Sequence, residues 1–283
     1  MSASHPWTAW VGRTEQHTDV ISGMQCEGLS ATLDRDDAEV VRGTELPPLW
    51  HWMYFPAIAK GRDIGPDGHP KRGGFLPPVP LPRRMWAGGR LSFAHPLRVG
   101  DEVIRTSRIA DIAMKDGRSG MLVFVTVRHE YADARGIAIK EEHDIVYRDM
   151  PVAGNTPARA GVAAPVDEHY SRAVAPDPVL LFRYSALTFN GHRIHYDRDY
   201  VTRVEGYPGL IVHGPLIATM LVDNLRRHHP RARLTSFHFR AVSPLFDIHP
   251  FTVCGRADGA NRHQLWARNH EGALAMEGTA ELA

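Results

Sequence analysis

Cysteine is scarce in this chain of 283 residues, which has only Cys26 and Cys254. The two lie in opposite halves without the close spacing of metal ligands, and a chain of this length can build its core without disulfides. We therefore expect two reduced, buried thiols in a cytoplasmic protein. Residues 1–13 lack a charged segment followed by an apolar one, so we expect no signal peptide.

Long hydrophobic runs and a surplus of charge are also missing. The longest apolar runs, such as residues 122–125, fall far short of the roughly 20 residues that a membrane helix needs. Lys plus Arg number 33 and Asp plus Glu 32, and this balance argues against a nucleic-acid partner. With 43% hydrophobic and 23% charged residues, the composition is typical of a folded globular protein and excludes a membrane protein or a largely disordered chain.

A stretch of linker composition divides the chain. Residues 151–178 are rich in Ala, Gly and Pro and offer little to bury in their first half. The length suits two domains. We predict an N-terminal repeat over residues 1–150, a linker over 151–178 and a C-terminal repeat over 179–283.

Both halves end in the same pattern. Residues 101–147 and 251–282 each contain three strand-like runs separated by short turns, several of them Asp-Gly or Glu-Gly, which is typical of antiparallel hairpins. Each group follows a Pro-Leu pair, Pro96-Leu97 or Pro244-Leu245. Any α+β domain contains hairpins, but two matching copies favour an internal duplication.

The clearest predicted helix begins at His213-Gly214-Pro215 and ends before Pro230. Gly is accepted at a helix N-cap, and Pro is favoured at the first helical position. The apolar residues recur at helical spacing and predict a buried stripe: Leu216, Ile217, Met220, Leu221 and Leu225. A long apolar helix followed by an antiparallel meander favours a sheet wrapped around that helix.

The densest polar cluster lies upstream of this helix, in residues 187–197. It holds Asn190, His192, Arg193, His195 and Asp197 between apolar residues. Burying these groups without partners would cost several kcal/mol. From the residues alone, the cluster is either a functional site or an exposed turn built on Asn190 and the glycine after it.

Residues 189–197 and 207–216 resemble the motif of the MaoC-type (R)-specific enoyl-CoA hydratases. In that motif an Asp, and a His five residues later, precede a Val-His-Gly-x-Leu helix start. The resemblance implies an α+β double hotdog, in which each of two repeats is a curved antiparallel sheet around a central helix. Residues 46–55 and 73–78 also resemble mesaconyl- and itaconyl-CoA hydratases and mitochondrial-type 3-hydroxyacyl-thioester dehydratases, so the likeness covers most of the chain.

By this resemblance, His195 matches the catalytic histidine, whereas Asn190 stands where the motif has its aspartate. An amide can orient water but cannot take its proton at ordinary pH. His195 would then be the sole acid/base, with Asn190 holding the water. At the helix start, Gly214 and Leu216 would donate backbone N–H groups to the thioester oxygen, because Pro215 has none.

Further site residues are expected around this pair. Arg183 or Arg193 would bind a carboxylate on the acyl group. Tyr196 and Asp197 would fix the tautomer of the catalytic histidine, and His213 would either brace the loop or touch substrate. Because the first half lacks such an Asn/Asp-to-His motif, we predict one active site per chain, between the repeats.

The expected protein is a hydro-lyase acting on an α,β-unsaturated acyl-CoA, with a short dicarboxylic acyl group of the itaconyl or mesaconyl type. Three alternatives stay open: a 3-hydroxyacyl-thioester dehydratase for longer or carrier-bound chains, a hotdog thioesterase, and a non-catalytic acyl-CoA binder. We predict no metal and no cofactor, since CoA is part of the substrate. We also expect no membrane partner, and the fold allows a homodimer of double-hotdog protomers.

Overall fold

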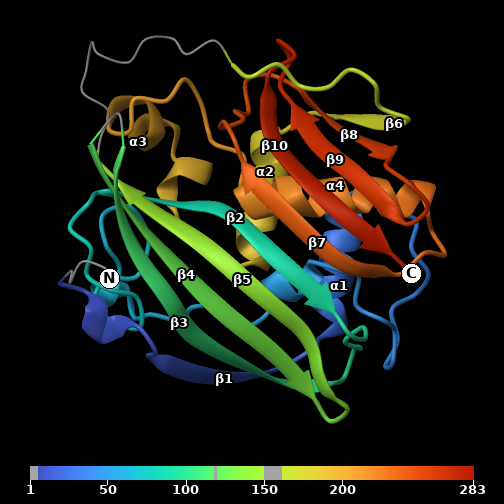
Figure 1. The fold of residues 1–283 in the computed structure, drawn as a ribbon, viewed down its shortest axis with the longest axis horizontal. Coiled ribbons are helices and arrows are strands. Elements are labelled where there is room, and N and C mark those ends of the chain that lie inside the picture. Colours follow the sequence, from blue (N-terminus) through green and yellow to red (C-terminus); the bar gives the residue numbers. More distant parts are fainter. Residues whose placement is uncertain (1–5, 118–119, 150–160) are drawn as a thin grey trace.

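The computed structural model describes residues 6–117, 120–149 and 161–283. Ten strands form one antiparallel sheet in the order β1-β3-β4-β5-β2-β7-β10-β9-β8-β6 (Figure 1). The first half contributes β1 (Thr14–Val20), β2 (Arg83–Phe93), β3 (Glu102–Gly117), β4 (Gly120–Asp133) and β5 (Gly136–Arg148). The second half contributes β6 (Tyr170–Val174), β7 (Leu234–Ala241), β8 (Phe251–Ala257), β9 (Arg262–Arg268) and β10 (Leu274–Leu282). The α-helices are α1 (Gly23–Thr32), α2 (Pro178–Leu187), α3 (Arg198–Arg203) and α4 (Gly214–His228).

The strand order has an internal symmetry. Counted from its own edge, the first half follows β1-β3-β4-β5-β2 and the second half follows β6-β8-β9-β10-β7. Each half therefore uses its strands in the same sequence, and the halves join where β2 pairs with β7. This topology is what the predicted internal duplication requires.

Helix α4 is the centre of the second half. Its apolar stripe is buried as predicted, and every residue from Leu216 to Leu225 is buried. The helix packs against β6, β8, β9 and β10, and Figure 1 shows it behind these strands. In the first half, α1 has only ten residues and packs against α2 and the short 3-10 helix η2 (Trp50–Met53).

One local expectation for the linker is wrong. Residues 170–174, which the sequence analysis assigned to the linker, form the edge strand β6 and pair with β8. A five-residue strand between prolines gives only a weak sequence pattern, and the pairing with β8 decides its structure. Residues 151–160 lie outside the described part of the chain, and the domain boundaries stay a prediction.

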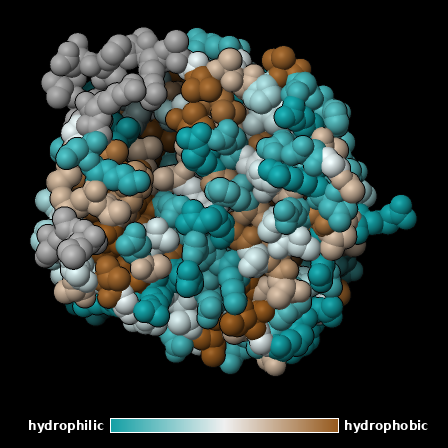
Figure 2. Space-filling model, in the orientation of Figure 1, coloured by the Kyte–Doolittle hydropathy of each residue, from teal (hydrophilic) through white to brown (hydrophobic). Residues whose placement is uncertain are grey.

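The two faces of the sheet differ in polarity. Figure 2 shows hydrophilic side chains crossing the middle of the face that is viewed in Figure 1. Cross-strand ion pairs account for part of this polarity: Arg90 lies 2.8 Å from Glu142 and 2.6 Å from Asp144, and Arg240 lies 2.6 Å from Glu277. The helices lie on the opposite side, which therefore holds the core. Among the described residues, no helix is long and apolar enough to cross a membrane.

Two methionines provide a test of the packing of α4. Met220 on α4 is 2% exposed, whereas Met24 on α1 is 76% exposed. We expect Met220→Ala to lower the free energy of unfolding by about 2–5 kcal/mol, because it removes buried methylene groups and leaves a cavity. Met24→Ala should change it by less than about 0.5 kcal/mol. Urea denaturation measures both, and equal losses would contradict the described packing.

Candidate active site

A cleft of about 1750 Å³ is lined by residues of both halves. The first half contributes side chains from the loop before β2 and from β2, β4 and β5. The second half contributes residues from α2, from the loop after it and from the start of α4. His195 and Asn190 both line this cleft.

His195 lies at the end of the 3-10 helix η4 (Arg193–His195) and is buried. Its Nδ1 lies 2.7 Å from the Ile211 carbonyl oxygen. A carbonyl can only accept, so Nδ1 carries the proton and Nε2 is left with its lone pair. Nε2 has no hydrogen-bond partner among the described residues. Burial lowers the pKa of His195 to about 4, so the ring is neutral at pH 7.

His213 supports that ring from behind. It is fully buried, and its ring stacks on His195 with centroids 3.6 Å apart and planes at 18°. Its Nε2 forms a 2.8 Å hydrogen bond with the Ser185 hydroxyl. Burial holds the pKa of His213 well below its usual value. The sequence left open whether His213 braces the loop or touches substrate. Because His213 does not line the cleft, its contacts fit the bracing role.

The start of α4 faces the same cleft. Gly214, Pro215 and Ile217 line it, and a Cβ placed on Gly214 would meet no atom within 4 Å. The Ile217 N–H already donates to the His213 carbonyl at 3.1 Å, whereas the Gly214 N–H has no partner among the described residues. Leu216, the second expected donor, is fully buried and does not line the cleft. The geometry therefore favours Gly214.

Asn190 is placed by a tight turn after α2. Phe189 adopts the left-handed conformation with φ 51°, which is rare for a bulky residue. The Asn190 N–H then donates to the Ser185 carbonyl at 2.8 Å, and its Oδ1 accepts from the His192 N–H at 3.0 Å. The Nδ2 group has no partner among the described residues. Asn190 therefore presents its amide donors to the cleft.

Three expected site residues do not line the cleft, and two of them pair with each other. Arg193 pairs with Asp197 at 2.7 Å, and Asp197 also caps α3 by accepting from the Tyr200 N–H at 2.9 Å. Neither Arg193 nor Asp197 lines the cleft, and Arg183 is exposed on α2 and does not line it either. Neither arginine is therefore placed to bind an acyl carboxylate in this cleft.

Tyr196 and Asp197 were expected to fix the tautomer of His195, but another group forms the hydrogen bond to its ring. The Ile211 carbonyl fixes the tautomer of His195, and neither Tyr196 nor Asp197 hydrogen-bonds to that ring. The Tyr196 hydroxyl instead donates to the Gly191 carbonyl at 3.0 Å, while the side chain lines the cleft. Ile211 lies 16 residues beyond the histidine, so the fold of the intervening loop supplies the contact.

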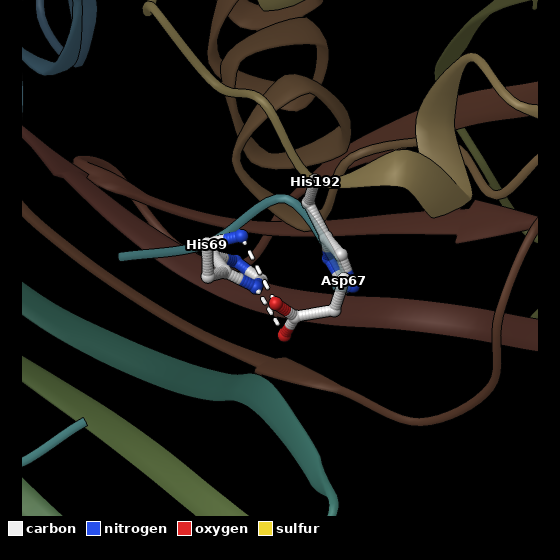
Figure 3. A group of neighbouring side chains, drawn as sticks. All are labelled: Asp67, His69 and His192. Atoms are coloured by element: carbon white, nitrogen blue, oxygen red, sulfur yellow. Dashed lines mark hydrogen bonds and ion pairs between the residues drawn. The ribbon is translucent and has the colours of Figure 1, made fainter. Parts of the chain in front are cut away.

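The first half also contributes the loop of residues 65–70, which the sequence did not predict as part of the site. Figure 3 shows Asp67, His69 and His192 side by side, with His69 Nδ1 3.0 Å from the Asp67 carboxylate. The His192 ring lies 4.0 Å from the His69 ring and 5.5 Å from the His195 ring. Burial lowers the pKa of His69 and of His192. An Asp and a His between two prolines were the only available signal.

Close backbone approach fixes this loop against the second half. Gly68 has φ +90°, and a Cβ there would lie 1.9 Å from the Gly191 carbonyl oxygen, so only glycine fits. The Arg193 N–H donates to the Asp67 carbonyl at 2.9 Å. The two repeats therefore build one continuous wall beside His195.

The donor set of Asp67, His69 and His192 would also suit a metal ion, whereas the sequence predicted none. One ligand atom from each lies within 4.8 Å of the others. In the structure, however, both Asp67 oxygens already accept hydrogen bonds from His69. The contacts present join Asp67 to His69 by hydrogen bonds, and the His69 ring lies against the His192 ring.

A profile of the family described as Hydroxyacyl-thioester dehydratase type 2 matches residues 49–247. A curated relative, mesaconyl-C(4)-CoA hydratase of Chloroflexus aurantiacus, is 48% identical over 282 residues, which is 99% of each chain. The mitochondrial hydroxyacyl-thioester dehydratase type 2 of Schizosaccharomyces pombe is 26% identical over 83% of this chain and 88% of that one.

Solved structures establish the fold. A MaoC-like dehydratase from Phytophthora capsici superposes with a TM-score of 0.69 at 17% identity, over 96% of both chains. A Mycobacterium tuberculosis protein described as a double hotdog superposes with a TM-score of 0.59 at 13% identity, again over 96% of both. The expected α+β double hotdog is confirmed.

The buried neutral histidines predict a loss of stability in acid. Burial lowers the pKa of seven of them: His69, His129, His143, His192, His195, His213 and His263. In the unfolded chain their pKa returns to about 6.5. Below that pH the unfolded state binds more protons than the folded state, so stability falls as the pH drops from about 6.5 towards 4.

Urea denaturation at pH 7.5 and at pH 5 measures this effect, and we expect a lower midpoint at pH 5. His238→Gln, which changes an exposed histidine on β7, should leave the difference between the two midpoints unchanged. A midpoint at pH 5 equal to or above that at pH 7.5 would show that these rings are not buried in the neutral form.

Proposed function

The chain belongs to the hydroxyacyl-thioester dehydratase type 2 family, whose members are hydro-lyases, and from this membership we propose that it adds water to an α,β-unsaturated acyl-CoA or removes it in the reverse direction. One observation carries the proposal. The free Nε2 of neutral His195 lies in a cleft beside the N-terminal end of α4. The site thus combines a base with a positive helix end, which are the two elements that water addition needs.

The proposed substrate has a short dicarboxylic acyl group, as in mesaconyl-CoA or itaconyl-CoA. The relative that shares 48% identity across the whole chain is named for the C4 thioester of mesaconate, and this supports the choice. CoA enters as part of the substrate, and the proposal needs no other cofactor. A cytoplasmic location and a homodimer stay predictions.

His195 would act as both base and acid. As the water oxygen bonds to Cβ, one water proton passes to Nε2 while the alkene electrons move towards the thioester oxygen. The resulting imidazolium then gives a proton to Cα. The lowered pKa of His195, about 4, keeps the ring unprotonated at pH 7 and makes its imidazolium a ready proton donor.

Asn190 and Gly214 would position the reactants. The free Nδ2 of Asn190 can donate to the attacking water, while its Oδ1 stays bound to the His192 N–H. The Gly214 N–H, at the positive end of α4, can donate to the thioester oxygen as it gains charge. The absence of a side chain at this position leaves room for that oxygen.

We expect His195→Ala to lower hydration of mesaconyl-C4-CoA by at least about 100-fold, because general acid–base catalysis is lost. Absorbance of the enoyl thioester bond follows the reaction. His238→Ala, at an exposed position, serves as the matched control and should keep wild-type activity. Wild-type rates in a folded His195→Ala protein would overturn the assignment of the base.

The same assays separate the alternatives. Release of free CoA thiol would indicate a thioesterase, and tight binding without any absorbance change would indicate a non-catalytic binder. A preference for long or carrier-bound enoyl chains over the dicarboxylic ester would indicate a dehydratase of the longer-chain type. Any of these results would replace the proposed function.

Gly214→Ala tests the helix end separately. The new methyl group meets no protein atom within 4 Å, so the free energy of unfolding should change by no more than about 1 kcal/mol. The methyl group would occupy space proposed for the thioester oxygen, so we expect kcat/KM to fall by roughly 10- to 100-fold. Unchanged kinetics would place the thioester elsewhere in the cleft.

A further inference from the structure

The cleft contains a cation that lacks a counter-ion. Arg84 on β2 is partly buried, lines the cleft and forms no ion pair with any described carboxylate. The described acidic residues that line the cleft are Glu15 and Glu141. Glu141 is fully engaged, since its carboxylate is bound by His51 at 3.2 Å, Trp52 at 3.0 Å and Tyr131 at 3.0 Å.

Tyr147 on β5 lies beside this cation. Arg84 and Tyr147 are Cα partners in the antiparallel β2–β5 pair, so their side chains project from the same face of the sheet. The Tyr147 side chain is fully buried and lines the cleft. Its hydroxyl makes no hydrogen bond of good geometry with a described residue, and Arg84 acts on it both through its charge and as a side-chain donor. A buried hydroxyl that lacks a well-formed hydrogen bond is destabilising, and an acceptor bound between it and Arg84 would remove that cost.

The surroundings of this pair are positively charged. The Arg72 guanidinium lies 5.6 Å from the centre of the Tyr147 ring, with its nitrogens bound to the carbonyls of Val79, Leu81 and Pro82. Burial raises the pKa of Tyr147, and Arg84 and Arg72 counteract part of that rise. An anionic ligand could therefore accept hydrogen bonds from the Tyr147 hydroxyl and from the Arg84 guanidinium together.

Arg84 and Tyr147 line the same cleft as His69 and His192. Arg84 helps to depress the pKa of His192 and of His69, after the larger effect of burial, so its charge is felt at both rings. The His192 ring lies 5.5 Å from the ring of His195. In an acyl-CoA, the pantetheine arm separates the phosphates from the thioester, so an anion held here belongs to the acyl group.

We propose that Arg84 and the Tyr147 hydroxyl bind the free carboxylate of a dicarboxylic enoyl-CoA and thereby select it over uncharged acyl groups. The inference rests on the proposed function and takes over the role that the sequence analysis gave to Arg183 or Arg193. In mesaconyl-C4-CoA the free carboxylate is attached to Cβ, the carbon that receives the hydroxyl. Its recognition would therefore also orient the alkene towards His195.

The experiment compares two substrates that differ only at this group. Mesaconyl-C4-CoA carries a carboxylate on Cβ where 3-methylcrotonyl-CoA carries a methyl group. We expect Arg84→Met to lower kcat/KM for the dicarboxylic ester by about 100-fold and for the neutral ester by less than about 3-fold. Arg84→Lys should recover part of the loss, because it restores the charge without the planar fork.

Tyr147→Phe removes one oxygen only. We expect a loss of about 3- to 10-fold in kcat/KM for the dicarboxylic ester, the range of one neutral hydrogen bond, with no loss for the neutral ester. Because the hydroxyl makes no well-formed hydrogen bond with a described residue, the urea midpoint should change little. Arg148→Met is the matched cleft control: its guanidinium approaches the Tyr207 hydroxyl at 3.5 Å, and any loss should be equal for both esters.

The outcomes are distinguishable from failure of the proposed function. Equal losses on both esters in Arg84→Met would overturn the carboxylate site and assign Arg84 to the CoA moiety or to folding. No hydration of either ester by the wild-type chain would overturn the proposed function instead. In that case inhibition or binding by the saturated pair, methylsuccinyl-C4-CoA and isovaleryl-CoA, still decides whether Arg84 selects a carboxylate.

Discussion

The site depends on the 2.7 Å hydrogen bond from His195 to the Ile211 carbonyl. This bond leaves one ring nitrogen free, and stacking on His213 holds the ring in place. Ile211 is itself held twice, by its N–H to the Ile194 carbonyl and by a bridge to Phe246, while the next N–H, of Val212, donates to the Leu245 carbonyl. The reactive nitrogen is thus anchored to the Pro-Leu corner that opens the second meander. A rigid support of this kind suits the proposed acid/base, which must take a proton from water and then give one to Cα.

Hydrophobic periodicity and turn residues predicted the helices and strands whose structure is decided within a single segment. The helix from Gly214 and the strands of both meanders agree with the structure within a few residues, because their periodicity and turn residues lie within single segments. His195 and Gly214 could be found for the same reason, since they lie in one short motif. Asp67 could not, because its place near His192 follows from contact between segments more than 100 residues apart. Arg84 could not either, because its pairing with Tyr147 follows from the register of β2 with β5. Polar side chains such as Arg193 and Asp197 were misplaced because sequence does not show that they bind each other.

The two repeats contribute different parts of the cleft. The second supplies the long helix, the histidine and the turn at Asn190, while the first supplies the loop of Asp67 and His69 and the wall that carries Arg84 and Tyr147. Helix α1 fits this division, because none of its residues lines the cleft and its N-terminal end is therefore not placed to meet a thioester there. With the proposed roles, residues that select the substrate can be substituted in the first half while the acid/base residue in the second half stays unchanged.

The junction of β2 with β7 has an evolutionary consequence. A single repeat of this topology would expose the strand that corresponds to β2 or β7 as an unpaired sheet edge, and this edge could pair with another chain. Two identical copies joined through that edge would form a closed pair with two-fold symmetry. When the two repeats are joined in one chain, the β2–β7 pairing is kept but the two repeats no longer need to be identical. Assembly of the cleft between them also becomes independent of protein concentration.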